Sequence, residues 1–324
     1  MRFAHAIRVI AAGALVVGCG SQATPTLGPA TLPPSGTPSP LATAAPTPAP
    51  TPAVAVVRFD ETLELADGRT LKARCVGEGT PTILLEVGGS GDMGDWQPQF
   101  VNELGTTTTT CLYSRAGGRG SSEPAERPVS MDDVTSDAFE LLALAKAKAG
   151  VEGPYIFVGW SLGGSVALGD ALARPDQTVG IAILDTDFPA DGLALCKASG
   201  RPAADCQAEY EDDIDARFME MQIAHAVHPL DIPAVLVTAM EYPECVETPG
   251  ATLSADISGA TIVADTCAGL AAAIADKQFQ DWPAALPEIV QTRVDADHDG
   301  LIRSEGHRIA ELILALVEEA RASG

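Results

Sequence analysis

A serine between two glycines offers the clearest chemistry in this sequence. Gly159, Ser161 and Gly163 form a G-x-S-x-G pattern that follows the apolar run 155–158 and precedes a stretch of small and apolar residues. This order predicts a strand, a sharp turn with Ser161 at its apex, and a helix. Glycines suit both flanks of such a turn because side chains there would clash. We expect Ser161 to be a nucleophile and the Leu162 N–H to stabilise an oxyanion; an ordinary glycine-rich turn is the alternative.

The segments around this turn alternate between strand and helix patterns. Residues 56–59 and 62–65 are predicted to be strands that flank a short polar break. A helix that begins after Ser130 as its cap is predicted over 132–149, and a terminal helix over 309–321. This alternation indicates an α/β fold with a mostly parallel sheet covered on both faces. Further strands are predicted at 70–76, 82–87, 108–113, 155–158, 181–184, 234–238 and 289–294.

The N-terminal 55 residues are not expected to belong to the folded domain. Residues 1–18 combine two early arginines with an apolar run too short to span a bilayer, which predicts a secretory signal. The signal ends in V-V-G before Cys19, which resembles the lipobox of bacterial lipoproteins. We therefore expect acyl chains on Cys19 and a membrane-anchored protein outside the cytoplasm; an ordinary signal peptide is the alternative. Residues 19–55, rich in Pro, Thr and Ala, indicate an extended tether.

The charge of the chain limits its partners. The formal net charge is −24, and removal of the signal with Arg2 and Arg8 would take it to −26. A nucleic-acid or anionic-lipid partner is not expected for so acidic a protein. Residues 56–324 have the size of one large α/β domain, and we expect a monomer that acts on a small molecule.

The cysteines predict disulfides. Seven are present. With Cys19 set aside as the expected acylation site, six remain, an even number in a protein expected to be exported. They lack the paired C-x-x-C spacing of zinc sites, so we expect neither a metal nor another cofactor. Proximity in the sequence favours two pairs and leaves a third: Cys196–Cys206, Cys245–Cys267 and, by elimination, Cys75–Cys111.

Over nearly all of residues 56–324, the chain resembles the α/β-hydrolase superfamily. Residues 85–91, L-E-V-G-G-S-G, followed by Trp96, resemble the oxyanion loop after the third strand. Residues 112–124 resemble the Y-D-R-A-G-x-G-x-S-x-P segment, with Ser114 in place of the usual Asp and one extra residue among the glycines.

This resemblance implies an eight-stranded, mostly parallel sheet with a small cap, at approximately 188–231. It also makes the second and fourth strands neighbours, which would place Cys75 beside Cys111. The acid run in the cap is interpreted as a solvated helix face, with an amine-binding patch as the alternative; it comprises Glu209, Glu211, Asp212, Asp213 and Asp215.

A base and a second oxyanion donor also follow from the resemblance. His298 comes directly after the last strand and before the terminal helix, where the superfamily places its base. His307, the rival, is expected to point away from the strand ends. The resemblance assigns the second oxyanion donor to Gly89, beside Leu162. The other three histidines are assigned to the signal or to a helix end: His5, His225 and His228.

The acid that orients the histidine follows the sixth or the seventh strand in the superfamily. After the sixth, Asp185 is favoured and Asp187 is an alternative; after the seventh, Glu241 or Glu244 could serve.

A calcium loop is a rival interpretation of the segment around His298. Asp295, Asp297 and Asp299 have the spacing of an EF-hand start, but the twelfth position is Gly306, with Glu305 one residue early. An acidic loop that holds the base is therefore favoured.

Together these expectations describe a hydrolase of carboxylic esters in which Ser161 attacks, His298 carries the proton and Asp185 orients His298. Two alternatives stay open: a peptidase or amidase on the same fold, and a catalytically silent lipoprotein that binds a surface partner.

Overall fold

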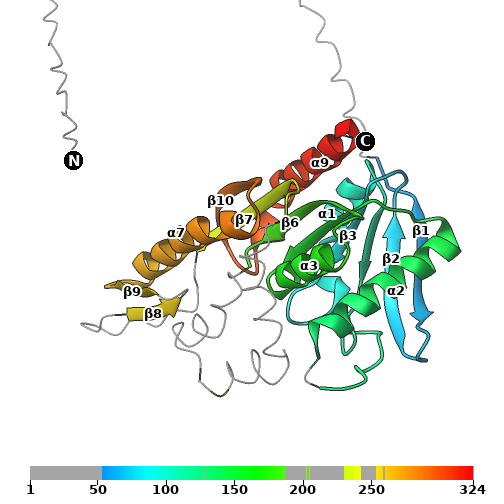
Figure 1. Cartoon of the computed structure of the whole chain (residues 1–324), viewed down its shortest axis with the longest axis horizontal. Helices are drawn as coiled ribbons and strands as arrows, with labels where there is room; N and C mark the ends of the chain where they lie inside the picture. The colour runs from blue at the N-terminus through cyan, green and yellow to red at the C-terminus, as the bar shows by residue number, and fades with distance from the viewer. Residues whose placement is uncertain are drawn as a thin grey trace, which may run out of the picture. The chain divides into compact units, whose positions relative to one another are not determined.

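An eight-stranded sheet forms the centre of the computed structural model (Figure 1). Its strands are β1 (Val57–Glu64), β2 (Thr70–Val76), β3 (Thr82–Glu86), β4 (Thr110–Tyr113), β5 (Tyr155–Trp160), β6 (Thr178–Leu184), β7 (Ala234–Glu241) and β10 (Ile289–Asp297). They lie in the order β1-β2-β4-β3-β5-β6-β7-β10. β2 is antiparallel to β1 and to β4, and the remaining pairs are parallel. The expected eight-stranded, mostly parallel sheet is confirmed.

The structure describes residues 53–127, 129–186, 230–241, 253–257 and 260–323, with two isolated positions, 202 and 204. The expected signal and tether, with Cys19, lie outside the described residues, as does most of the expected cap. His225 and His228 also lie outside them.

Helices cover both faces of the sheet (Figure 1). α2 (Met131–Ala149), α3 (Leu162–Ala173) and α7 (Cys267–Ala285) pack with one buried cluster. α1 (Pro98–Gly105), α8 (Leu301–Ser304) and α9 (Gly306–Ser323) pack with the other. β3 shows how one strand serves both: Leu84 belongs to the first cluster, and Ile83 and Leu85 to the second. Successive side chains of a strand point to opposite faces, which explains this division.

β1 differs from the expectation of two strands around a polar break. It is one strand, paired with β2 from Val57 to Glu64. Asp60 and Glu61 are exposed and lie within ion-pair distance of Lys72 and Lys148, respectively. β1 is an edge strand, so its polar side chains can face solvent without ending the strand.

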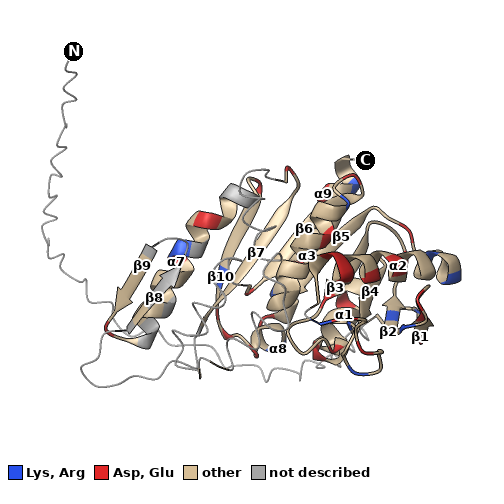
Figure 2. Ribbon diagram, turned by 60° about the horizontal axis from the view of Figure 1, so that its bottom comes forward, with Lys and Arg blue, Asp and Glu red and all other residues tan. Residues whose placement is uncertain are grey.

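α2 begins and ends as its sequence predicts. Ser130 caps it in a capping box with Asp133, which confirms the expected cap. Acidic side chains lie in its first turn and basic ones in its last turn (Figure 2). Both placements complement the helix dipole. Gly150 ends the helix in the left-handed conformation (φ 63°).

A disulfide joins the second and fourth strands. Cys75 and Cys111 are directly opposite each other in the register of β2 and β4 and are bonded, as expected. The other two predicted pairs stay predictions. Cys196, Cys206 and Cys245 lie outside the described residues, and of Cys267 only the backbone at the start of α7 is described.

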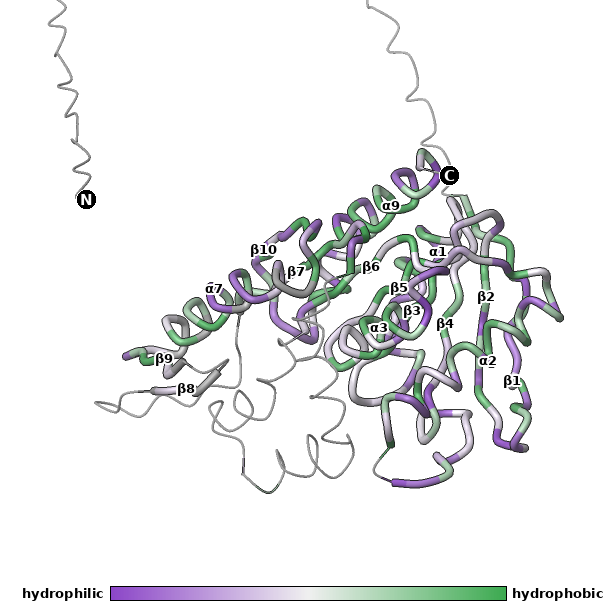
Figure 3. The backbone as a smooth tube through the Cα atoms, in the orientation of Figure 1, coloured by the Kyte–Doolittle hydropathy of each residue, from purple (hydrophilic) through white to green (hydrophobic). Residues whose placement is uncertain are grey.

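The last third of the chain contains elements that the sequence interpretation did not include. These are a two-stranded hairpin, β8 (Leu253–Ile257) with β9 (Ala260–Ala264), and α7, which buries Trp282. Within the described part of the chain, no helix is long and apolar enough to cross a membrane. α9 instead alternates between hydrophilic and hydrophobic residues, as expected for a helix with one buried face (Figure 3).

Candidate active site

Three side chains that the sequence singles out follow the carboxyl ends of parallel strands. Ser161 comes directly after β5, Asp185 after β6 and His298 after β10. Parallel strands end at the same edge of a sheet, which is where ligands bind in open α/β folds.

These three residues form one hydrogen-bonded chain. His298 Nε2 lies 2.9 Å from Ser161 Oγ, and His298 Nδ1 lies 2.6 Å from Asp185 Oδ2. The other oxygen of the Asp185 carboxylate accepts the Ala239 N–H at 2.8 Å. An acceptor at Nδ1 favours the tautomer with its proton there, which leaves Nε2 free to accept the serine proton.

The turn at Ser161 is strained and closely packed. Its φ of 56° and ψ of −131° lie outside the regions that non-glycine residues favour. A Cβ on Gly159 would lie 1.9 Å from the carbonyl oxygen of Gly163, and one on Gly163 would lie 2.1 Å from that of Glu86. Both contacts are with backbone, so only glycine fits at either position.

A third glycine and a threonine complete the turn, and the sequence interpretation missed both. A Cβ on Gly164 would lie 1.9 Å from Thr186 Oγ1. That hydroxyl donates to the Ser161 carbonyl at 2.7 Å. The residue before the threonine, Asp185, has a positive φ of 47°, and its N–H donates to the Val237 carbonyl at 2.7 Å. The repeated glycine after the serine was the only sequence signal for this contact.

Trp160, the residue before the serine, holds the histidine. Its indole stacks on the His298 ring with centroids 5.2 Å apart and planes 29° apart. Its Nε1–H donates to the His298 carbonyl at 3.3 Å. One side chain therefore restrains both the ring and the backbone of His298.

Residues 87–91, the part of the expected oxyanion loop (85–91) that follows β3, lie beside the serine. A Cβ on Gly88 would lie 3.4 Å from the Cβ of Ser161. Gly89 follows Gly88, and Leu162 is the first residue of α3. The two residues chosen as oxyanion donors therefore belong to segments that meet at Ser161.

Arg115 forms hydrogen bonds with three backbone carbonyl groups of this loop. Its guanidinium donates to the carbonyls of Val87 and Gly88, and its backbone N–H donates to the Gly91 carbonyl at 2.9 Å. The side chain is only 10% exposed. Backbone carbonyls of the loop are thus fixed by one residue.

Two buried carboxyl groups lie next to this arginine. Burial raises the pKa of Glu86 to about 7, against the opposing effects of the Arg115 charge and the Tyr113 hydroxyl. Burial, together with the neighbouring Glu86, also raises the pKa of Asp170 well above its usual value.

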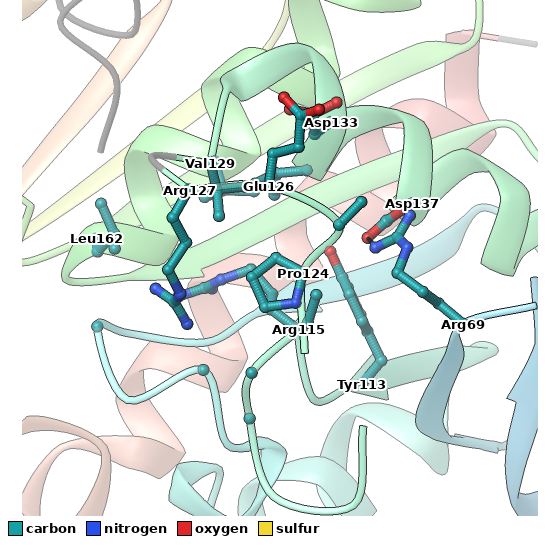
Figure 4. A pocket seen from close by; sticks show the side chains of 18 of the residues that line it. Arg69, Tyr113, Arg115, Pro124, Glu126, Arg127, Val129, Asp133, Asp137 and Leu162 are labelled. Carbon is teal, nitrogen blue, oxygen red and sulfur yellow. Dashed lines mark hydrogen bonds and ion pairs between the residues drawn. The ribbon is translucent and has the colours of Figure 1, made fainter. Parts of the chain in front are cut away.

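A pocket of about 540 Å³ opens beside the oxyanion loop (Figure 4). Gly89 and Leu162 both line it. Figure 4 shows Leu162 at one end and the facing side chains of Arg69 and Asp137 at the other. These two form a bidentate ion pair with N–O distances of 2.6 and 2.7 Å. The remaining charged side chains of the lining are Arg115, Glu126, Arg127 and Asp133.

The rival residues do not join the chain of hydrogen bonds, or lie outside the described part. The His307 ring is 77% exposed, and its Nδ1 lies 2.5 Å from Glu103 of α1. Asp187 and Glu244 are not described, and Glu241 is described only as the backbone at the end of β7.

In the acidic segment around His298, Asp297 stabilises the turn that follows β10. β10 continues through Asp297, whose carboxylate accepts the N–H of Gly300. Among the residues that the structure describes, no group of three or more His, Cys, Asp or Glu side chains could hold a metal ion.

A scan against protein-family models gives no match, and neither does a search of curated proteins. Solved structures do match. Alpha/beta hydrolase domain-containing protein 10 from mouse is 17% identical, with a TM-score of 0.53 over 81% of this chain and 99% of that one. The enol-lactonase from Burkholderia xenovorans LB400 is 15% identical, with a TM-score of 0.51 over 79% and 99%. The Pyrococcus furiosus esterase Pf2001 is 11% identical, with a TM-score of 0.53 over 81% and 89%. With the strand order above, these similarities show that the chain has the α/β-hydrolase fold.

Proposed function

We propose that the chain is a serine hydrolase that cleaves carboxylic esters through an acyl-enzyme intermediate. The observation that carries the proposal is the chain of hydrogen bonds from Ser161 through His298 to Asp185. A serine hydroxyl needs such a base, and the base needs a carboxylate to set its tautomer.

In the acylation step, Ser161 Oγ attacks the ester carbonyl carbon and its proton passes to His298 Nε2. The Asp185 carboxylate stabilises the imidazolium that forms. The N–H groups of Gly89 and Leu162 donate to the oxyanion. Collapse of the tetrahedral intermediate breaks the C–O bond, and His298 returns the proton to the leaving alkoxide.

Deacylation repeats this sequence with water. His298 Nε2 takes a proton from a water molecule as the water oxygen attacks the acyl-enzyme carbonyl carbon. The carboxylic acid then leaves as the proton returns to Ser161. No other reactant is required, so these three side chains and two backbone donors suffice for the reaction.

The solved structures of the same fold support an acyl-transfer reaction, since their names include an enol-lactonase and an esterase. Both a lactone and an ester present a carbonyl with an oxygen leaving group. Polar and apolar side chains line the pocket beside Gly89 and Leu162 in similar measure. The Arg69–Asp137 ion pair at its far end favours short acyl groups, because a long alkyl chain would desolvate this pair.

We further propose that the domain works outside the cytoplasm, anchored through acyl chains on Cys19. The Cys75–Cys111 disulfide supports this proposal, because disulfides persist mainly in oxidising compartments. Mass spectrometry of the protein from membranes tests it: the expected mature N-terminus is an acylated Cys19, and an unprocessed N-terminus contradicts the proposal.

Labelling of the full chain with a fluorophosphonate probe at neutral pH tests the hydrolase itself. We expect labelling of the wild type and its loss in Ser161→Ala and His298→Ala. Ser304→Ala and His307→Ala are matched controls, since both side chains are exposed and lie outside the hydrogen-bonded chain. An unlabelled wild type would contradict the proposal.

Hydrolysis assays then separate esters from amides. We expect p-nitrophenyl acetate to be cleaved much faster than aminoacyl anilides. Cleavage of the anilides alone would leave Ser161 as nucleophile but assign the protein to the peptidases.

A further inference from the structure

Two carboxyl groups without a role in the proposed mechanism are completely buried near Arg115, the residue that contacts the oxyanion loop. Glu86 is the last residue of β3, and Asp170 lies in α3, the helix that starts at Leu162; both are 0% exposed. Tyr113 of β4 and Thr135 of α2 are the polar neighbours of this pair. Burial of an ionised carboxylate is costly unless it is paired and hydrogen-bonded, so the two groups cannot both carry a charge at low cost.

The contacts of the two groups indicate which one keeps the proton. Neither oxygen of Asp170, nor Oε1 of Glu86, meets the geometry of a hydrogen bond with a described residue, although Asp170 lies close enough to Glu86 and to the Thr135 hydroxyl to influence its ionisation. Glu86 Oε2, in contrast, accepts the Tyr113 hydroxyl at 3.1 Å and lies 4.0 Å from Arg115 Nη1. A hydroxyl donor and a cation both stabilise the ionised form. The charge therefore belongs on Glu86 and the proton on Asp170.

Arg115 links this charge to the oxyanion loop. The same guanidinium that faces Glu86 donates to the Val87 and Gly88 carbonyls, and Gly88 packs against Ser161. A guanidinium that is 10% exposed needs an anion nearby, and Glu86 is the carboxylate within ion-pair distance of it in the described part of the chain.

We propose that Arg115, Glu86 and Asp170 form a positioning unit for the oxyanion loop. The Glu86 carboxylate holds the Arg115 guanidinium against the loop, and Asp170 carries the proton that allows the two acids to be buried together. The catalytic consequence rests on the proposed function, because the donors of this loop act on the transition state of ester hydrolysis. None of the three residues touches the reacting atoms.

The unit responds to pH because its charge depends on one ionisation. Tyr113, Arg115 and Asp170 are the titratable groups that act on Glu86, and Glu86 and Arg115 act on Asp170, whose other neighbour is the Thr135 hydroxyl. Since the pKa of Glu86 is raised to about 7, acidification protonates it and removes the partner of Arg115. The loop is then held less firmly.

Steady-state kinetics of the full chain with p-nitrophenyl acetate test this unit. At pH 8, we expect Glu86→Gln to lower kcat on the order of 10- to 100-fold with KM within about threefold, because the displaced donors act in the transition state. Asp170→Asn keeps a neutral group of the same shape, so its decrease in kcat should be at least about fivefold smaller than that of Glu86→Gln. Glu288→Gln, an exposed glutamate, is the matched control.

The ratio of wild-type kcat to that of Glu86→Gln should shrink as the pH falls below about 7, because the wild type itself then loses the Glu86 charge. Effects of pH that do not depend on Glu86 cancel in this ratio. A kcat of Glu86→Gln within twofold of the wild type at pH 8 overturns the proposal. So does a larger loss in Asp170→Asn than in Glu86→Gln.

Amide hydrogen exchange at Gly88, Gly89 and Gly91 gives a second readout that needs no catalysis. We expect faster exchange in Glu86→Gln than in Asp170→Asn, with a native thermal transition in both. If Glu86→Gln does not fold, Arg115→Lys serves instead: it keeps the positive charge but loses the planar guanidinium that donates to two carbonyls, and it should show the same faster exchange. Unchanged exchange overturns the positioning unit, whereas an inactive wild type with the expected exchange overturns only the proposed function.

Discussion

The Trp160 indole stacks on the His298 imidazole at 5.2 Å and at the same time donates its Nε1–H to the His298 carbonyl. The tryptophan precedes Ser161, so the turn that carries the nucleophile also orients the base. Aromatic contacts of this kind contribute about 1 kcal/mol. This is enough to change how often Nε2 faces Ser161.

We expect Trp160→Leu to lower kcat about tenfold with little change in KM, because the ring of His298 loses its restraint. Trp160→Phe keeps an aromatic ring but not the N–H donor, so its loss should be smaller. Steady-state kinetics with p-nitrophenyl acetate provide the measurement. Equal activity of Trp160→Leu and the wild type would show that His298 is oriented without the tryptophan.

Asp185 is the acid that the geometry favours, and its substitution should be far more damaging. Asp185→Asn can offer an N–H to His298 Nδ1 and so favour the wrong tautomer. We expect kcat to fall about 10³- to 10⁴-fold, while thermal unfolding stays near that of the wild type. Glu241→Gln, at the end of the next strand, serves as the control and should keep most of the activity. The reverse result would assign the acid to Glu241.

The sequence allowed prediction of the positions that lie at strand ends. Ser161, Asp185 and His298 each follow a recognisable strand, and parallel strands bring their carboxyl ends together. The resemblance to the α/β-hydrolase superfamily supplied the strand order and the positions of the base and the acid. The Cys75–Cys111 bond was predictable for a similar reason, since it depends only on β2 and β4 being neighbours.

The contacts that support the site were not predictable in the same way. The hydrogen bonds from Thr186 to Ser161 and from Arg115 to Val87 join residues that no local sequence pattern connects. Each bond depends on the direction of a side chain in the folded protein. The prediction of two strands around a polar break was wrong for a related reason. Asp60 and Glu61 are exposed because β1 lies at the edge of the sheet, and only the order of all the strands defines that edge.

The glycines of the turn give a prediction on stability. Gly163→Ala would place a methyl group 2.1 Å from the Glu86 carbonyl oxygen, and backbone cannot move aside cheaply. We expect a loss of about 3 kcal/mol or more in the free energy of unfolding, or failure to fold. Gly89→Ala is the matched control, because nothing lies within 4 Å of the added Cβ. Its thermal transition, followed by circular dichroism, should lie close to that of the wild type. A stable Gly163→Ala would contradict the packing described for the turn.

The pKa of Glu86 gives a prediction on how stability depends on pH. Burial raises this pKa from 4.5 to about 7 in the folded protein, so between these pH values the folded state binds more protons than the unfolded state. The Glu86 contribution to the free energy of unfolding therefore falls as the pH rises through this window, by at most about 1.4 kcal/mol per unit. It becomes constant roughly one pH unit above this pKa, where Glu86 is ionised in both the folded and the unfolded state.

Glu86→Gln lacks this ionisation, so its stability relative to the wild type should rise between about pH 4.5 and pH 7, by up to about 3 kcal/mol. Urea unfolding of both proteins across this range gives the difference, in which the titrations of groups distant from Glu86 cancel. Glu288→Gln, which removes an exposed glutamate, should give a flat difference over the same range. A flat difference for Glu86→Gln as well would mean that Glu86 titrates in the folded protein as it does in the unfolded chain, and the charge on this buried group could then not depend on pH near neutrality.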